Sequence, residues 1–152
     1  MDKTDRKILK VLQENARASL QEIGQAVGLS TTPCWGRIKK MEEAGIIQGY
    51  TVRIDPVAIG LADTVMVQVT LDSHSDTTLE DFGKTLAAIP EVIEAYLMSG
   101  DYDYLLRVAV KDTRDYERLL RERLYKIKGL RHSKSGFVLR TLKKSHYPMD
   151  LD

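Results

Sequence analysis

The most constraining feature of this sequence is the stretch from Leu20 to Ile47, whose apolar residues and glycines fit two short helices joined by a tight turn. Ser19 and Glu22 fit a capping box, which predicts that a helix begins there. Gly28 falls where that helix would end in a left-handed residue, a conformation that glycine adopts at little cost. Gly24 faces the expected helix crossing, where a small side chain permits close approach. The stretch therefore predicts a helix-turn-helix whose second helix is the candidate reader of DNA.

The second helix of this pair is expected to start at Ser30 as N-cap and to end at Gly45. Cys34, Ile38 and Met41 form its apolar face, so a step of 100° per residue turns the intervening positions outward. Hydroxyls suit base edges or phosphates, and cationic side chains suit phosphates or guanine. The candidate DNA contacts are Ser30, Thr31, Thr32, Pro33, Trp35, Gly36, Arg37, Lys39 and Lys40.

Each of these features also has a plainer interpretation. The cationic side chains could form a solvated face on a packing helix, although the glycine turn and the caps favour DNA. Trp35 would either touch the sugar-phosphate backbone or seal its helix against the first one. Gly36 costs helix stability, and it either lets the backbone approach DNA or removes a base contact. Cys34 lies on the apolar stripe, which favours a small buried hydrophobe over a redox or metal role.

The rest of the N-terminal part fits a small domain. Asp2 would cap a first helix that runs through Asn15. Ile46 to Asp55 is rich in β-branched residues and is expected to form a hairpin, or wing. We therefore predict a winged helix-turn-helix domain over residues 1–55 and a linker over residues 56–63.

Beyond residue 63 the pattern predicts a second domain, over residues 64–152. Val65, Val67, Val69 and Leu71 alternate as one face of a strand. The expected elements are that strand, a helix from Leu79 to Ile89, strands at Val92–Ser99 and Tyr104–Val110, a helix from Tyr116 to near Gly129, and a strand at Lys134–Lys143. This β-α-β-β-α-β order is ferredoxin-like, so the whole chain is expected to be α+β.

The sheet of this second domain is expected to be apolar on both faces. Its two helices must cover one face, and the other face would still present Met66, Tyr96, Met98, Val138 and Leu142. A second copy of the chain is the simplest source of a covering layer. We therefore predict a homodimer through the second domain.

Composition permits DNA binding without requiring it. The 152 residues carry a formal net charge of +1, with 9 basic and 7 acidic groups in residues 1–60. There is no apolar stretch of membrane-spanning length and no signal-peptide core, and a single cysteine excludes an internal disulfide framework. These observations predict a cytoplasmic protein that does not insert into membranes.

The turn Gly100–Asp103 is the second candidate site. Asp101 and Asp103 are suited to an ammonium group, and backbone N–H groups beside Tyr102 are suited to a carboxylate, which is the polarity of an amino acid. On residues alone, an ordinary acidic hairpin turn is the favoured interpretation.

Two other groups of residues favour structural interpretations. A basic run in the last third alternates with acids and is expected to be a solvated face with local ion pairs, not a second nucleic-acid surface. It comprises Arg114, Arg118, Arg121, Arg123, Lys126, Lys128 and Arg131. His74, His132 and His146 lack metal-ligand spacing, and no nucleophile–base pair or phosphate loop is present. We predict no catalytic residue, metal or cofactor.

Several motifs together resemble the Lrp/AsnC (feast/famine) transcriptional regulators over essentially the whole length. They are DKTDRKIL at the start, LSTTPCWGRIKKMEEAGII, GDYDYLLRV from Gly100, and SKSGFVL from Ser133. Gly36 departs from the family's usual larger residue. The resemblance implies a DNA-binding domain joined to an amino-acid-sensing domain, with dimers that assemble into octamer-like rings.

The resemblance also reverses the interpretation of the acidic turn. It implies an effector pocket between dimers formed by Gly100, Asp101, Tyr102 and Asp103, with Ser133 and Ser135 from the last strand. The expected function is sequence-specific regulation of transcription at a pseudo-palindromic site in double-stranded DNA, in response to an amino acid. The alternatives are an effector-independent architectural DNA-binding protein of the nucleoid type, and a small-molecule sensor or enzyme without DNA binding.

Overall fold

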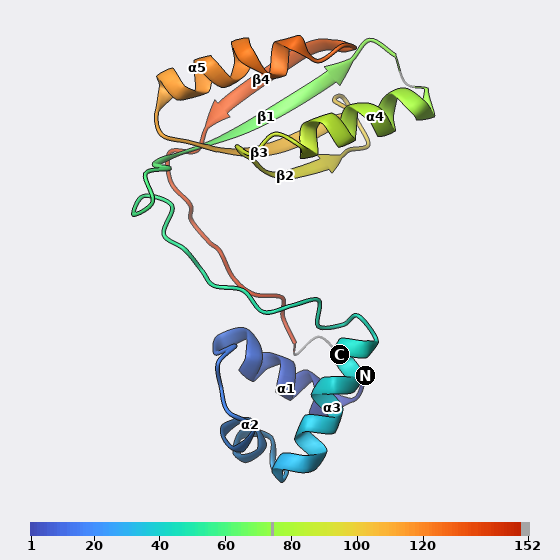
Figure 1. The fold of residues 1–152 in the computed structure, drawn as a ribbon, viewed down its shortest axis with the longest axis vertical. Helices are drawn as coiled ribbons and strands as arrows, with labels where there is room; N and C mark the ends of the chain where they lie inside the picture. The colour runs from blue at the N-terminus through green and yellow to red at the C-terminus, as the bar shows by residue number, and fades with distance from the viewer. Residues whose placement is uncertain (74, 150–152) are drawn as a thin grey trace. The chain divides into compact units, whose positions relative to one another are not determined.

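The computed structural model describes residues 1–73 and 75–149, apart from the side chains of 76–78 (Figure 1). Contacts along the backbone divide the chain into two units. One comprises Met1–Arg53 with the end of the chain from Lys143, and the other comprises Ile54–Leu142. Each unit encloses its own hydrophobic core.

The first unit consists of three helices, α1 (Lys3–Glu14), α2 (Leu20–Val27) and α3 (Thr31–Glu43). Asp2 and Asp5 form a capping box at α1, and Ser19 and Glu22 form one at α2. Both helices therefore begin where the caps predict. Ser30 is the N-cap residue of α3, but its side chain makes no capping hydrogen bond.

The turn between α2 and α3 depends on two glycines. Gly28 has φ of 74°, the left-handed conformation expected after α2. A Cβ placed on Gly24 would lie 2.5 Å from the backbone oxygen of Leu29, so Gly24 does permit a close approach, but the approaching backbone belongs to the turn and not to the second helix as predicted. The buried core of this unit is Ile8, Ile23, Cys34, Ile38 and Met41.

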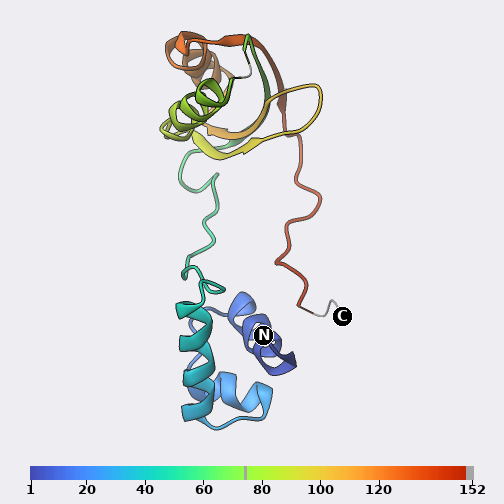
Figure 2. The same cartoon turned by 90° about the vertical axis from the view of Figure 1, so that its right-hand side faces the viewer.

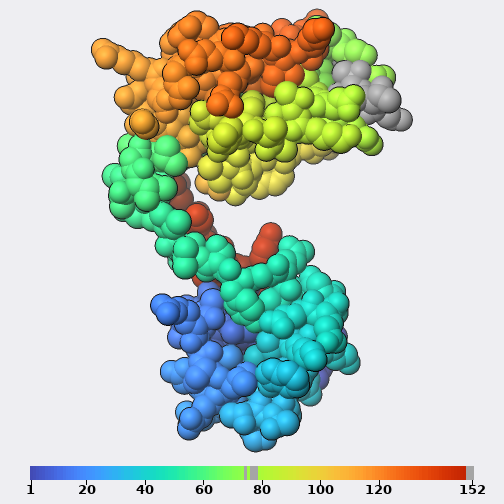
Figure 3. Space-filling model, viewed as in Figure 1, coloured from blue at the N-terminus to red at the C-terminus, as the bar shows by residue number. Residues whose placement is uncertain are grey.

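The wing predicted at Ile46–Asp55 is not formed. No residue of this segment lies in a β-strand. Gly45, with φ of 67°, ends α3, and the Ile46 N–H closes the turn on the Met41 carbonyl. Beyond it Tyr50, Val52 and Ile54 are exposed, on the turquoise-to-green segment of Figure 3. Tyr50 instead donates its hydroxyl to the Glu42 carboxylate of α3 at 2.8 Å, so the segment contacts that helix without pairing as two strands.

The second unit has the predicted α+β order. Its elements are β1 (Asp63–Leu71), α4 (Asp76–Ala87), β2 (Val92–Leu97), β3 (Tyr104–Val110), α5 (Thr113–Glu122), a 3₁₀ turn (Leu124–Lys126) and β4 (Leu130–Phe137). The strands form one antiparallel sheet in the order β2-β3-β1-β4. The ferredoxin-like topology is confirmed.

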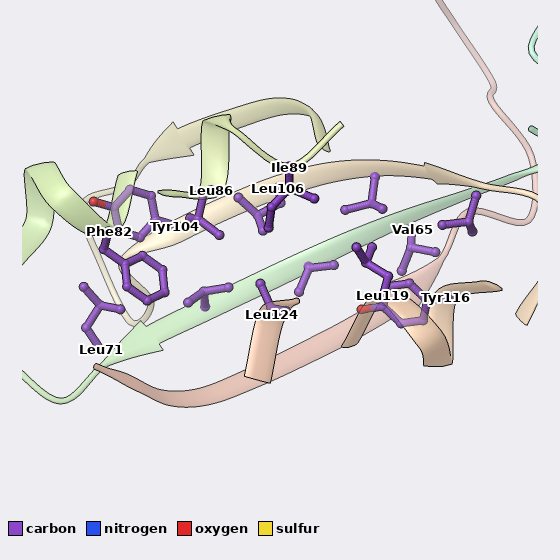
Figure 4. Packing of buried hydrophobic residues seen from close by; sticks show 14 residues of the cluster. Val65, Leu71, Phe82, Leu86, Ile89, Tyr104, Leu106, Tyr116, Leu119 and Leu124 are labelled. Carbon is purple, nitrogen blue, oxygen red and sulfur yellow. The ribbon is translucent and has the colours of Figure 1, made fainter. Parts of the chain in front are cut away.

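Helices α4 and α5 lie on the same side of this sheet (Figure 2). The alternating residues of β1 point toward them and are fully buried, as predicted. Figure 4 shows how Phe82 and Leu86 of α4 and Leu119 of α5 meet this face, with Tyr104 stacked on Phe82. The core is therefore a single layer between the sheet and the two helices.

The last two elements differ from their predicted bounds. The sequence predicts the last strand at Lys134–Lys143, but β4 runs from Leu130 to Phe137, and its final pairing residue lies opposite Val65 near the start of β1. The helix expected to reach Gly129 ends at Glu122, and Leu124 enters the core from a 3₁₀ turn. Apolar spacing alone does not distinguish a helix from a helix followed by such a turn.

The face of the sheet opposite the helices carries some of the apolar side chains expected there, but not all of them. Met66 is half-buried, and Tyr96, Met98 and Val138 are exposed. Tyr96 donates to Glu94, which also accepts from Arg107, so part of this face is polar. Leu142 is exposed beyond the end of β4 and does not belong to the sheet.

Candidate nucleic-acid interface and effector turn

The start of α3 presents a cluster of exposed polar groups. Ser30, Thr31, Thr32 and Pro33 are all exposed. Because the hydroxyl of Ser30 makes no capping bond within the described chain, it is available to an outside partner. The buried face of the same helix is Cys34, Ile38 and Met41, as predicted, and burial raises the pKa of the Cys34 thiol.

Trp35 lies on the outer surface of α3. It is 52% exposed and does not belong to the core cluster of the unit, which favours the outward role over a seal against α1. The Lys39 ammonium stands 5.1 Å from the centre of its ring, in cation–π geometry. Lys39 also lies 3.8 Å from the Glu43 carboxylate, so three residues form one exposed row.

Gly36 and Lys40 are exposed beside that row. A Cβ on Gly36 would meet nothing within 4 Å, so a larger side chain fits there. A hollow of about 770 Å³ opens beside this part of α3 and is lined mainly by α3 and the start of α1.

Arg37, predicted as a phosphate contact, differs from its neighbours on α3. Its guanidinium Nη1 donates to the Asp2 carboxylate at 2.6 Å and to the Asp5 carboxylate at 2.7 Å. These bonds raise the pKa of Arg37 further above its usual value. The pKa of the Asp2 carboxyl is lowered by the backbone N–H of Asp5 and then by Arg37.

The second candidate site is the turn between β2 and β3. Gly100 has φ of 133°, Asp101 is exposed and Tyr102 is half-buried. Asp103 has a different position, because its carboxylate accepts the backbone N–H of Leu71 at 2.7 Å. The turn thus exposes Asp101, while Asp103 attaches it to the end of β1.

The residue after the turn joins it to a helix. Tyr104 donates its hydroxyl to the carbonyl of Leu79 in α4, and burial raises the pKa of that hydroxyl. Gly83 of α4 leaves room for the Tyr104 ring. The effector turn is therefore held between a strand end and a helix.

The two serines of β4 lie at different distances along the strand from this turn. Ser133 pairs with Val69, whose carbonyl accepts the backbone N–H of Asp103, so Ser133 lies across β1 from the turn. Ser135 pairs with Val67, farther along, and its hydroxyl is hydrogen-bonded to the Tyr116 hydroxyl at 2.6 Å. Both face the helix side of the sheet. The structure brings Ser133 near the turn and engages Ser135 elsewhere.

Other candidate clusters have structural partners. Arg118 contacts Asp115, Glu91 and Glu122, and Arg121 contacts Glu117, as the ion-paired interpretation of the basic run predicts. Within residues 1–73 and 75–149 there is no group of three potential metal ligands. His74 lies outside the described residues. No described helix is long and apolar enough to cross a membrane.

Two functional relationships were missed from the sequence. The pairing of Arg37 with Asp2 and Asp5 joins positions more than 30 residues apart, and only the acid spacing at the start of α1 hinted at a shared partner. The attachment of Asp103 to Leu71 depends on strand register, which alternation does not determine.

Comparison with known proteins agrees with this division of roles. Residues 1–48 match a family described as winged helix-turn-helix DNA-binding, and residues 64–148 match the Lrp/AsnC ligand binding domain. The chain is 38% identical over 143 residues to the DNA-binding transcriptional activator DecR of Escherichia coli K12, covering 94% of each. It is 36% identical to the leucine-responsive regulatory protein of the same organism, covering 96% of this chain and 89% of that protein.

Solved structures are similar over nearly the full length. An AsnC family transcriptional regulator from Agrobacterium tumefaciens has a TM-score of 0.93 at 42% identity, covering 99% of this chain and 98% of that one. The transcriptional regulator NMB0573 from Neisseria meningitidis, solved as a complex with L-Met, has a TM-score of 0.93 at 33% identity, covering 99% and 97%. These likenesses favour regulation over a sensor or enzyme without DNA binding. The chain belongs to the Lrp/AsnC family of DNA-binding transcriptional regulators.

Proposed function

We propose that this regulator senses an amino acid at the turn Gly100–Asp103 and responds by changing how α3 binds DNA or by changing its oligomeric state. The observation that carries this proposal is the arrangement of the turn, which presents the Asp101 carboxylate outward while Asp103 is used internally. A carboxylate on an exposed turn suits the ammonium group of an amino acid. The L-Met complex of the Neisseria relative supports this ligand class.

We propose that the DNA contacts are the first turn of α3 and its exposed row. They comprise Ser30, Thr31, Thr32, Pro33, Trp35, Gly36, Lys39 and Lys40. Hydroxyls at a helix N-terminus suit phosphates or base edges, and the lysines suit phosphates. Two such helices in a dimer would meet a pseudo-palindromic site whose halves are about one helical turn apart, or a multiple of it.

The proposed assembly is a homodimer that associates further into an octamer, in the cytoplasm, without catalytic activity. The exposed apolar residues on the open face of the sheet support the dimer. We assign residues 1–55 to DNA binding, 56–63 to the linker and 64–152 to effector binding and assembly. The division between the two structural units falls between Arg53 and Ile54, which supports a boundary near residue 55. The chain from Lys143 groups with the first unit, however, which differs from its assignment to the second domain.

A thermal-shift screen of the twenty amino acids tests the effector. A ligand at one hundred times its Kd stabilises the native state by about 2.7 kcal/mol. Asp101→Ala is expected to abolish the shift and the effector's influence on DNA binding while sparing DNA binding itself. Glu117→Ala, which removes an exposed carboxylate from α5, serves as the control. An undiminished response of Asp101→Ala would refute the assignment.

A further inference from the structure

Arg37 connects the reader helix to the first turn of α1. One guanidinium nitrogen donates to a carboxylate oxygen of Asp2 and to one of Asp5, at 2.6 and 2.7 Å. Two carboxylates on one nitrogen fix a side chain more closely than a single surface ion pair does, because the two directions constrain its rotamer.

The two aspartates are themselves fixed before Arg37 binds them. Asp2 accepts the backbone N–H of Asp5 on its other oxygen, and Asp5 accepts the backbone N–H of Asp2, each at 2.8 Å. Each carboxylate thus uses one oxygen for the capping box and the other for Arg37. The negative charges also lie at the positive end of the α1 dipole. Arg37 therefore binds a rigid, pre-formed acceptor pair.

Among the described residues, a hollow separates parts of α3 and the start of α1 beside these ion pairs. The hollow of about 770 Å³ is lined there by Asp2, Asp5, Gly36, Arg37 and Lys40, where packed side chains would otherwise join the helices. The buried contacts of the unit are made by Ile8 and its core partners. The two ion pairs therefore join α3 to the first turn of α1 beside this hollow.

We propose that Arg37 is a positioning residue for DNA recognition, which orients α3 on α1, and that it does not contact phosphate as the sequence pattern predicts. This inference rests on the proposed role of α3 as the reader of DNA. It assigns the phosphate contacts of this helix to Lys39 and Lys40, and it gives the aspartates at the start of the chain a role in DNA affinity although they carry the wrong charge for DNA.

Asp5→Asn tests the inference because two roles of Arg37 predict opposite signs. If Arg37 contacts phosphate, Asp5 competes for it, and the variant binds DNA more tightly. If Arg37 positions α3, Asp5→Asn binds roughly tenfold more weakly, despite the gain in positive charge. Arg37→Gln should then lose affinity to a similar degree, and the double variant should lose no more than either single one.

The salt dependence of binding supplies a second readout. The plot of log K against log salt has a negative slope, and loss of one phosphate contact reduces the magnitude of that slope by about 0.9. We expect Arg37→Gln to leave the slope unchanged and Arg37→Lys to restore much of the lost DNA affinity. Lys40→Gln should reduce the magnitude of the slope by about 0.9. Tighter binding by Asp5→Asn, or a lowered slope for Arg37→Gln, would overturn the inference. An unchanged slope for Lys40→Gln would instead count against the proposed DNA face of α3.

Glu22→Gln is the matched control, because Glu22 completes the capping box of α2 as Asp5 does that of α1, and the described residues show no ion pair between Glu22 and an arginine. Its removal should not weaken DNA binding. Circular dichroism confirms that each variant is folded at the assay temperature. If Arg37→Gln is unfolded at the assay temperature, Asp5→Asn still distinguishes the two roles of Arg37 by the direction in which DNA affinity changes. Asparagine keeps a side-chain oxygen that can accept the Asp2 N–H, so the α1 cap is retained.

Discussion

The Asp103 carboxylate accepts the backbone N–H of Leu71 at 2.7 Å and so attaches the acidic turn to the end of β1. The Asp103 N–H also donates to the Val69 carbonyl, which adds a backbone link to the same strand. The two aspartates of the turn therefore differ in role: Asp103 holds the turn to β1, whereas Asp101 is exposed.

Asp103→Ala is expected to destabilise the protein. The substitution leaves the partly buried N–H of Leu71 without its acceptor, which costs about 1–3 kcal/mol. Asp101→Ala should change the free energy of unfolding by less than about 0.5 kcal/mol, as exposed positions do. Urea denaturation of the two variants in parallel makes the comparison. Equal stabilities would show that the bond to Leu71 contributes little.

Gly24→Ala is expected to destabilise the first unit. The new methyl group would lie 2.5 Å from the Leu29 backbone oxygen, and a backbone atom yields less readily than a side chain. Overpacking of this kind costs about 1–3 kcal/mol. Gly36→Ala is the matched control, because its methyl group meets nothing within 4 Å and alanine favours the helix by about 1 kcal/mol. Thermal unfolding should therefore move in opposite directions for the two variants, and a shared direction would contradict the packing argument.

These glycines illustrate what can be predicted from the sequence. Local patterns identified the caps of α1 and α2, the left-handed turn at Gly28 and the buried face of β1, because each depends on residues close in the chain. The same reasoning failed at the wing, where a strand needs a partner that local sequence does not supply.

Relationships between distant segments were not predictable in this way. That Ser135 binds Tyr116 follows from the register of β4 on β1, which alternation leaves undetermined. Arg37 looked like any cation on an exposed helix face, and only the packing of α1 beside α3 shows its two partners.

Gly36→Arg is expected to raise nonspecific DNA affinity. The side chain fits without a clash and adds a cation to the proposed DNA face. One more phosphate contact should increase the slope of log K against log salt by about 0.9 in magnitude. Gel-shift titrations over a range of salt concentrations measure both quantities, with Gly36→Ala as the uncharged control. Unchanged affinity and slope would mean that this face does not meet DNA.

Trp35 offers a direct optical test of the proposed interface. It is the single tryptophan of the chain and is 52% exposed beside Lys39, so the indole emission reports on this one place. DNA binding at α3 should shield the ring from water, shift its emission to shorter wavelength or quench it, and release the effect as salt dissociates the complex. Lys39→Ala, which removes the stacked ammonium, should alter the emission of the free protein and weaken DNA binding. Emission that stays constant at saturating DNA would place the indole away from the complex and would exclude Trp35 from the interface.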